Sequence, residues 1–211
     1  VKNLLEFYKK GLFPMADNST SEIINLYQPN KRFIIPIENF HVPKKLFKLF
    51  KNNIYTFKIN YDFKNVISKC QLASRKDNGT WINNIILNSY LNLHYEKMAH
   101  SVECYKKNQL VGGLYGVHIG GCFFGESMFS ELTNTSKFCL LYLIAILKKN
   151  LFSLLDSQFY NQHLIQFGAF EISNKDYLEK LKVSLKYDRA FNIIDSFQEI
   201  LSLLQPNNHK S

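Results

Sequence analysis

Two carboxylates stand inside strongly apolar segments of the sequence, and these are the first candidates for chemistry. Leu154-Leu155-Asp156-Ser157-Gln158 places a carboxylate and an amide two residues apart, and Phe123-Phe124-Gly125-Glu126 places a second carboxylate. Two-residue spacing in a strand projects Asp156 and Gln158 onto the same face. Such a pair at the end of a buried strand can orient and polarise one reacting group. The alternative is that these side chains only satisfy local backbone groups, as buried polar residues commonly do.

Other kinds of catalytic site find little support. Ser101 follows His100, but the sequence has no nucleophile elbow, and the spacing of its histidines matches no metal-binding motif. Gly112-Gly113 and Gly120-Gly121 suit turns or bulges better than a phosphate-binding loop. The four cysteines show no Cys-x-x-Cys spacing, which favours reduced thiols in a cytosolic protein. We therefore expect no metal site.

The elements that position these residues predict a mixed α+β fold with one central sheet. Strands are expected over residues 100–105, 110–118 and 122–130 as an antiparallel meander, followed by a buried helix over 135–149 and a strand over 152–156. Asn134 or Thr135 is expected to cap that helix, and Asn150 to close it in the left-handed conformation. Residues 11–15 are interpreted as a turn followed by a polar loop. Further strands are expected over 32–37, 54–59 and 169–172, and helices over 3–10, 43–50, 61–72, from 81, over 161–167, from 173, and beyond 188.

The charge of the chain bears on its partners. Its 211 residues hold 26 Lys and Arg against 17 Asp and Glu, a net charge of +9. That field favours nucleic acid or anionic membranes, although a generally lysine-rich surface explains the same number. One predicted helix face carries Lys44, Lys45, Lys48 and Lys51, as a phosphate-binding surface needs, or as an ordinary solvated face does. The longest apolar run, residues 138–147, is too short to span a bilayer, so no membrane partner is expected.

Several short motifs follow one another in a fixed order from about Leu5 to Leu181. They are Gly11-Leu12-Phe13-Pro14, Trp81-Ile82, His100-Ser101-Val102-Glu103, Leu110-Val111-Gly112-Gly113-Leu114-Tyr115-Gly116-Val117, Phe124-Gly125-Glu126-Ser127-Met128-Phe129-Ser130 and Leu155-Asp156-Ser157-Gln158. In this order and spacing the series resembles the leucyl/phenylalanyl-tRNA–protein transferases. Each motif alone is weak, whereas the ordered series is highly specific.

The resemblance implies a fold, a reaction and a set of partners. Such enzymes move Leu or Phe, and more weakly Met, from aminoacyl-tRNA to the N-terminal Arg or Lys of proteins, which marks those proteins for N-end rule degradation. They need no metal or coenzyme. The resemblance implies a small, shortened N-terminal α/β domain over residues 1–61, a GNAT-like (acyl-CoA N-acyltransferase-like) domain over 62–188, and a C-terminal helix and tail over 189–211. We expect a cytoplasmic monomer.

Carried over by motif, the resemblance also assigns residues. Asp156 and Gln158 become the catalytic pair, with Glu126 beside them. The Gln158 amide oxygen is expected to hold the attacking amine, and Asp156 to orient that network and counter the developing positive charge. Glu126 is expected to steady the network or pair with the basic acceptor side chain. The aminoacyl-adenosine end of tRNA is assigned to Trp81, Met15, Ser101, Phe123, Leu114 and Leu140, the last three as the side-chain pocket, and the tRNA backbone to Lys44, Lys45, Lys48 and Lys51.

Some positions depart from the family pattern. Met15 stands where Trp is frequent, Leu26-Tyr27-Gln28-Pro29 replaces a Trp-Trp-Ser-Pro-like segment, and Ser157 replaces the usual Cys. A degenerate, non-catalytic RNA-binding relative is therefore the alternative. A coenzyme-A-dependent acetyltransferase is less well supported, because the sequence lacks a Gln/Arg-x-x-Gly-x-Gly/Ala loop for the pyrophosphate.

Overall fold

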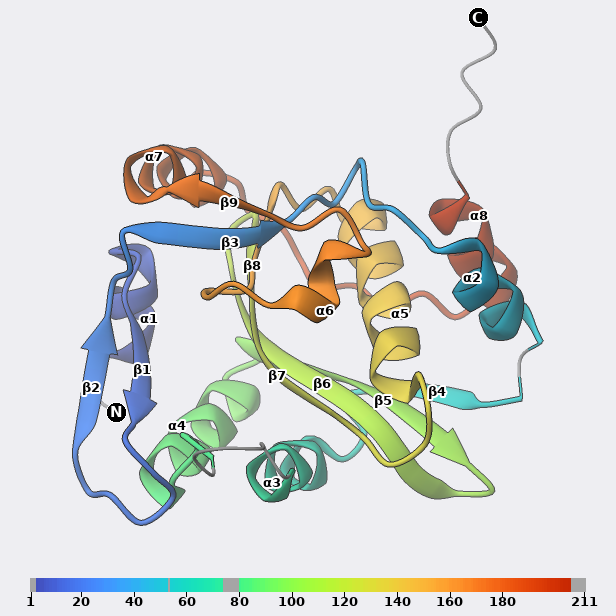
Figure 1. Ribbon diagram of the computed structural model, residues 1–211, viewed down its shortest axis with the longest axis horizontal. Helices are drawn as coiled ribbons and strands as arrows, with labels where there is room; N and C mark the ends of the chain where they lie inside the picture. The colour runs from blue at the N-terminus through green and yellow to red at the C-terminus, as the bar shows by residue number, and fades with distance from the viewer. Residues whose placement is uncertain (1–2, 53, 74–79, 206–211) are drawn as a thin grey trace, which may run out of the picture.

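The computed structural model describes residues 3–52, 54–73 and 80–205 of the chain (Figure 1). Within them, a seven-stranded sheet has the order β4-β5-β6-β7-β8-β3-β9. Only β7 and β8 pair in parallel among these described strands. The predicted mixed α+β class is confirmed. The strands are β3 (Lys31–Ile35), β4 (Thr56–Ile59), β5 (Ala99–Lys106), β6 (Gln109–Ile119), β7 (Cys122–Ser130), β8 (Leu154–Asp156) and β9 (Phe170–Ser173).

Helices cover both faces of this sheet, and each face has its own core. One core is formed with α2 (Lys44–Lys51), α5 (Thr135–Lys149) and α8 (Phe197–Leu204). The other is formed with α1 (Leu4–Lys9), α3 (Phe63–Leu72), α4 (Asn84–Tyr95) and α7 (Asn174–Ser184). Residues 138–147 of α5 are all buried, as their unbroken apolar run predicts. The short helix α6 (Gln162–Ile165) follows β8 and lies beside α5 (Figure 1).

The predicted meander is confirmed as β5, β6 and β7, and it contains a β-bulge. Tyr115 on β6 pairs with Ser127, whereas the next residue, Gly116, pairs with Gly125. Glu126 is therefore the extra residue on β7. A bulge bends its strand and re-aims the side chains around it, so the regular inside–outside alternation ends there.

Strands from the first third of the chain belong to the same sheet. β3 inserts between β8 and β9, with Ile34 opposite both Asp156 and Phe170, and β4 pairs with β5. The boundary predicted at residue 61 thus has strands of one continuous sheet on both sides. The division into 1–61, 62–188 and 189–211 stays a prediction, and residues 206–211 of the expected tail lie outside the described residues.

Three local predictions are corrected. Residues 11–30 contain a hairpin of β1 (Phe13–Ala16) and β2 (Ile24–Tyr27) instead of a turn and a polar loop. The polar composition of the segment conceals these strands. Pro14 is tolerated because β1 belongs to a two-stranded sheet and pairs on one side only. Asn134 makes no side-chain cap bond, and the Thr135 hydroxyl instead donates to the carbonyls of Val111 and Leu132. The left-handed residue after α5 is Leu151, while Asn150 uses its side-chain amide to bind the Ile146 and Asn192 carbonyls.

Candidate active site

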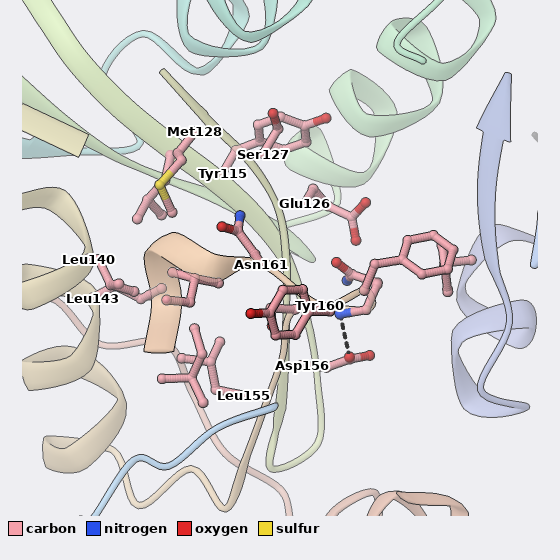
Figure 2. A pocket seen from close by; sticks show the side chains of 18 of the residues that line it. Tyr115, Glu126, Ser127, Met128, Leu140, Leu143, Leu155, Asp156, Tyr160 and Asn161 are labelled. Atoms are coloured by element: carbon pink, nitrogen blue, oxygen red, sulfur yellow. Dashed lines mark hydrogen bonds between the residues drawn. The ribbon is translucent and has the colours of Figure 1, made fainter. Parts of the chain in front are cut away.

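A cavity of about 320 Å³ opens where β7 and β8 meet α5, α6 and the β1–β2 hairpin. Its lining joins two chemically different ends. Figure 2 shows leucine side chains of α5 and β8 on one side and the carboxylates of Glu126 and Asp156 on the other. Cavities of this size hold small ligands, and a few converging polar groups in an apolar wall fix their orientation.

The carboxylate of Asp156 is completely buried and is held by a buried arginine. Arg32 binds it through two nitrogens, with Nε 2.9 Å from Oδ1 and Nη2 2.6 Å from Oδ2. The Tyr177 hydroxyl donates to Oδ2 at 2.8 Å. Burial opposes the charge of Arg32, but the adjacent Asp156 raises the pKa of Arg32 above its ordinary value. Asp156 and Arg32 therefore form a neutral ion pair behind the cavity.

Gln158 reaches the cavity by a different geometry from the one predicted. β8 ends at Asp156, and Gln158 adopts a left-handed backbone with φ 62°, so the two residues do not share a strand face. The Asp156 carboxylate accepts the Gln158 backbone N–H at 2.9 Å, the contact drawn as a dashed line at Asp156 in Figure 2. Both side chains still line it. The Gln158 Nε2 atom is buried and has no hydrogen-bond partner among the described residues, which leaves it ready to donate to a bound group.

Glu126 lies on the bulge of β7 and faces the cavity from the same side as Asp156. Its carboxylate accepts hydrogen bonds from Tyr8 of α1 at 2.6 Å and Tyr90 of α4 at 2.7 Å. Burial raises the pKa of Glu126 to about 7, although the two tyrosine hydrogen bonds oppose the shift. No salt bridge joins Glu126 to a cation within the described residues. It is thus a carboxylate that titrates near neutrality and is open to a cationic ligand.

The apolar end of the cavity comes from both strands and helices. Leu114 on β6 pairs with Met128 on β7, and both line the cavity together with Leu140 and Leu143 of α5 and Leu155 of β8. This end of the cavity is therefore lined by aliphatic side chains and a thioether, and it suits an apolar guest. Leu114 and Leu140, both predicted for the side-chain pocket, line the cavity.

Trp81 and Met15 line the same cavity from the side of the β1–β2 hairpin. The backbone N–H of Ala16 donates to the Trp81 carbonyl at 3.2 Å, which ties the hairpin to the segment before α4. Phe13 and Phe159 also line the cavity, and their rings make an edge contact with centroids 5.3 Å apart. This side of the cavity is therefore aromatic, as a surface for stacking a planar base would be.

The chain is similar to known proteins over most of its length. The family described as leucyl/phenylalanyl-tRNA protein transferase matches residues 34–182. The leucyl/phenylalanyl-tRNA–protein transferase of Maricaulis maris is 43% identical over 193 residues, 92% of this chain and 89% of that protein. The chain belongs to this family. The protein of the same description from Hyphomonas neptunium is 44% identical over 191 residues, 90% of this chain and 74% of that protein.

One solved structure shows a weaker likeness. The structure of L-PGS from Bacillus licheniformis aligns with 86% of this chain and 62% of that chain, with 14% identity and a TM-score of 0.42. A likeness of that size supports no argument about the site. The assignment to the transferase family rests on the sequence matches alone.

Two predicted residues lie away from the cavity of this family member. Ser101 is buried on β5 and donates to Glu103 Oε1 at 2.7 Å. Phe123 is fully buried in the core, and its ring covers Gly116 so closely that a Cβ there would lie 2.4 Å from it. Neither is among the residues that line the cavity. Lys44, Lys45, Lys48 and Lys51 are exposed along α2 and also lie outside the cavity.

The structure adds residues that the motifs did not single out. Arg32 and Tyr177 hold Asp156, Tyr8 and Tyr90 hold Glu126, and Asn161 lines the cavity beside Gln158. A signal for Arg32 was present, because an arginine at the start of the buried strand Arg32-Phe33-Ile34-Ile35 needs a buried partner. The sequence gave no signal for Tyr8, Tyr90 or Tyr177, since Tyr is common throughout this chain.

The described residues show neither a metal centre nor a membrane-spanning helix. They contain no group of three or more His, Cys, Asp or Glu side chains placed to hold a metal ion. None of their helices is long and apolar enough to cross a membrane.

Proposed function

We propose that this chain transfers leucine, phenylalanine or methionine from aminoacyl-tRNA to the N-terminal Arg or Lys of proteins and so marks them for N-end rule degradation. We place the reaction in the cytoplasm, in a monomer whose residues 62–188 form a GNAT-like domain. Membership of the family supports the reaction. The observation that carries the site is one cavity that joins a leucine-lined end to Asp156, Gln158 and Glu126.

The apolar end is assigned to the transferred side chain. Leu114, Leu140, Leu143 and Leu155 surround a space that accepts the flexible side chains of Leu and Met and the flat ring of Phe. One misplaced methyl group in such a pocket costs about 1–3 kcal/mol, which is enough to disfavour Ile and Val. The fit therefore selects the donor by shape, with no hydrogen bond to the side chain.

Gln158 is assigned to the reacting atoms. In the transfer, the α-amine of the acceptor forms a C–N bond with the ester carbonyl carbon, and the C–O bond to the tRNA 3′ oxygen breaks. The amine has an ordinary pKa of about 7.7–8.0, so positioning matters more than strong base catalysis. The Gln158 amide oxygen accepts a hydrogen bond from the amine. Its unpartnered Nε2 donates to the carbonyl oxygen as negative charge develops there. The amine proton leaves with the 3′ oxygen, through the neighbouring 2′ hydroxyl.

The two carboxylates take different roles. Asp156 is paired with Arg32, so we assign it to orienting Gln158 rather than to countering charge. Glu126 has tyrosine partners but no salt bridge among the described residues, and we assign it to the cationic acceptor, which carries a basic side chain. A half-buried carboxylate such as Glu126 attracts such a cation more strongly than a fully exposed one does.

The remaining contacts concern the tRNA. Trp81 and Met15 are assigned to the terminal adenosine, because they line the aromatic side of the cavity. The exposed lysines Lys44, Lys45 and Lys48 of α2 are assigned to the tRNA backbone, with Lys51 at the end of the same helix. Because tRNAs for different amino acids must be accepted, contacts to phosphates suit this function better than contacts to bases.

The α2 assignment has a matched control. Replacing Lys44, Lys45 and Lys48 with Gln should weaken tRNA binding, and the slope of log affinity against log salt should fall by about 0.7–0.9 for each lost phosphate contact. The same change at Lys175, Lys180 and Lys182 of α7, which are also exposed, should leave the slope unchanged. Equal slopes for the two triple variants would make α2 an ordinary solvated face.

The decisive test is transfer of radiolabelled leucine from Leu-tRNA to a peptide that begins with Arg. Transfer to this peptide, and none to the same peptide beginning with acetylated Arg, is the expected result. Binding of Leu-tRNA without transfer would overturn the enzymatic assignment in favour of a non-catalytic RNA-binding relative.

A further inference from the structure

Arg32 lies directly behind the candidate catalytic pair. It is fully buried and is not among the residues that line the cavity, whereas Asp156 and Gln158 both line it. Arg32 therefore has no route to a bound substrate except through Asp156. Any part that it plays in the reaction must be indirect.

The guanidinium of Arg32 is fixed on all sides. It lies between the rings of Phe13 and Tyr177, with Cζ 4.6 and 4.4 Å from their centroids. Its Nη1 donates to the Gly11 carbonyl at 3.0 Å, and its other nitrogens bind Asp156. An arginine held by two rings and a two-nitrogen contact has one orientation, and lysine cannot reproduce that geometry.

A continuous series of hydrogen bonds leads from Arg32 to Gln158. The Asp156 carboxylate accepts from Arg32 and Tyr177 and then, through Oδ1, from the Gln158 backbone N–H. The neighbour of Arg32 completes the turn, because the Phe33 N–H donates to the Gln158 carbonyl at 3.1 Å and the Ser157 N–H donates to the Phe33 carbonyl. A left-handed backbone at a residue other than glycine costs about 1–2 kcal/mol, so these contacts must hold Gln158 in place.

We propose that Arg32 and Tyr177 are positioning residues for aminoacyl transfer, which hold Asp156 so that Asp156 keeps Gln158 turned with its side-chain amide in the cavity. The inference rests on the proposed function, since it assigns Gln158 to the reacting atoms. On this proposal, the main contribution of Arg32 and Tyr177 to the reaction is the orientation of the Gln158 side chain and not the stability of the fold.

Arg32 also bears on the second carboxylate. The groups around Glu126 are Tyr8 from α1, Tyr90 from α4, Asp156 from β8 and Arg32 from β3; the charge of Asp156 raises the pKa of Glu126, and that of Arg32 lowers it. Exchanging Arg32 for a neutral residue leaves Asp156 unneutralised and moves the pKa of Glu126 upward. This shift reports the charge of Arg32, whereas kcat and the side-chain signals of Gln158 report its positioning role.

The structure offers a matched pair of variants for the test. Tyr177→Phe removes a 2.8 Å hydrogen bond to the buried Asp156, and Tyr105→Phe removes a 2.8 Å hydrogen bond to the buried Glu103, which lies outside the cavity. Both changes should lower the melting temperature by similar amounts. Tyr177→Phe should lower kcat for leucine transfer by about tenfold with little change in KM for Leu-tRNA, whereas Tyr105→Phe should keep kcat. Equal kcat values for the two variants would overturn the proposal.

Arg32→Lys keeps the charge but loses the two-nitrogen contact, and Arg32→Met loses both. We expect kcat to fall by about tenfold or more in each, with the acid limb of the pH profile moved upward only in Arg32→Met. Wild-type kcat in folded Arg32→Lys would contradict the positioning role.

A readout that needs no activity separates this inference from the proposed function. The side-chain amide resonances of Gln158, assigned with Gln158→Glu, should shift or broaden in Tyr177→Phe and Arg32→Lys and stay unchanged in Tyr105→Phe. Unchanged Gln158 signals in all three variants would overturn the inference. If the wild-type protein transfers no leucine, the proposed function fails, and these signals still decide whether Arg32 and Tyr177 position Gln158.

Discussion

Glu103 on β5 and Glu126 on β7 lie on either side of β6, and the protein satisfies their carboxylates to different extents. Glu103 accepts from the backbone N–H groups of Tyr61 and Asp62 and from the hydroxyls of Ser101 and Tyr105. Glu126 accepts from two tyrosine hydroxyls and faces the cavity. The first carboxylate holds the start of α3 to the sheet, and the second keeps bonding capacity for a ligand. Burial alone therefore does not mark a functional acid, whereas incomplete satisfaction beside a cavity does.

Asp156 is satisfied by several donors, as Glu103 is, yet it lines the cavity as Glu126 does, and the pair of Asp156 and Gln158 gives the largest expected effects. Gln158→Ala should lower transfer by about 10²–10³-fold with little loss of stability, because its side-chain nitrogen has no partner among the described residues. Asp156→Ala should lose comparable activity and also about 3–5 kcal/mol of unfolding free energy, because Arg32 is then buried without its partner. Kinetics on the folded fraction and denaturant titration separate the two, and the double variant should be little slower than either single one. Near-normal turnover in folded Asp156→Asn would contradict the mechanism.

Matched substitutions at the two glutamates test the comparison directly. Glu103→Gln puts an NH2 group among hydrogen-bond donors and should cost about 1–3 kcal/mol of unfolding free energy while kcat per folded molecule is kept. Glu126→Gln should cost less stability and lower kcat/KM for an Arg-initiated peptide by about tenfold or more, through loss of a charge-assisted contact. The comparison fails if Glu103→Gln reduces kcat/KM as much as Glu126→Gln does.

The pH dependence of stability gives a third test. Glu126 has a pKa of about 7 in the folded protein and an ordinary value of 4.5 when unfolded. Because the folded state holds this proton more tightly, the contribution of Glu126 to stability is largest below pH 4.5 and is lost as the pH rises to about 7. The loss amounts to as much as about 3 kcal/mol. Urea titrations between pH 4.5 and 8 should show the unfolding free energy of the wild type falling by this amount relative to that of Glu126→Gln. The same pH dependence in both proteins would show that Glu126 titrates normally.

Leu114 and Phe123 form the apolar counterpart of the two glutamates, one lining the cavity and one buried in the core. Leu114→Phe should reduce the ratio of Phe to Leu transfer by about tenfold, because overfilling a packed pocket costs about 1–3 kcal/mol and Phe fills more of it. Phe123→Leu should lower the melting temperature and leave the ratio in place. The ratio is measured with Phe-tRNA and Leu-tRNA in competition. If only Phe123→Leu changes the ratio, the donor pocket has been assigned to the wrong residues.

Some of these features follow from the sequence and others do not, for physical reasons. The meander and α5 follow from apolar periodicity, which tertiary contacts reinforce. The sequence predicts Asp156 and Gln158 as a pair on one strand face, whereas β8 ends at Asp156, whose side chain accepts the N–H of the left-handed Gln158. Their catalytic role stays a prediction. Phe123 is buried in the core outside the cavity, against Gly116 and before the bulge at Glu126, and neither feature is visible in the sequence. Arg32 was missed because its partner lies 124 residues away.

The pairing of β3 with β8 has a consequence for the order in which the chain matures. Arg32 is synthesised early, yet Asp156 and Tyr177 join it only after most of the chain has left the ribosome. The meander β5–β7 pairs neighbours in sequence, so it can form on a nascent chain, whereas β3 must wait for β8 and β9. A nascent chain cut before β8 thus has its sheet begun and its reactive centre still unbuilt. A chain that terminates before β8 therefore keeps Arg32 but lacks the carboxylate and the tyrosine hydroxyl that surround it.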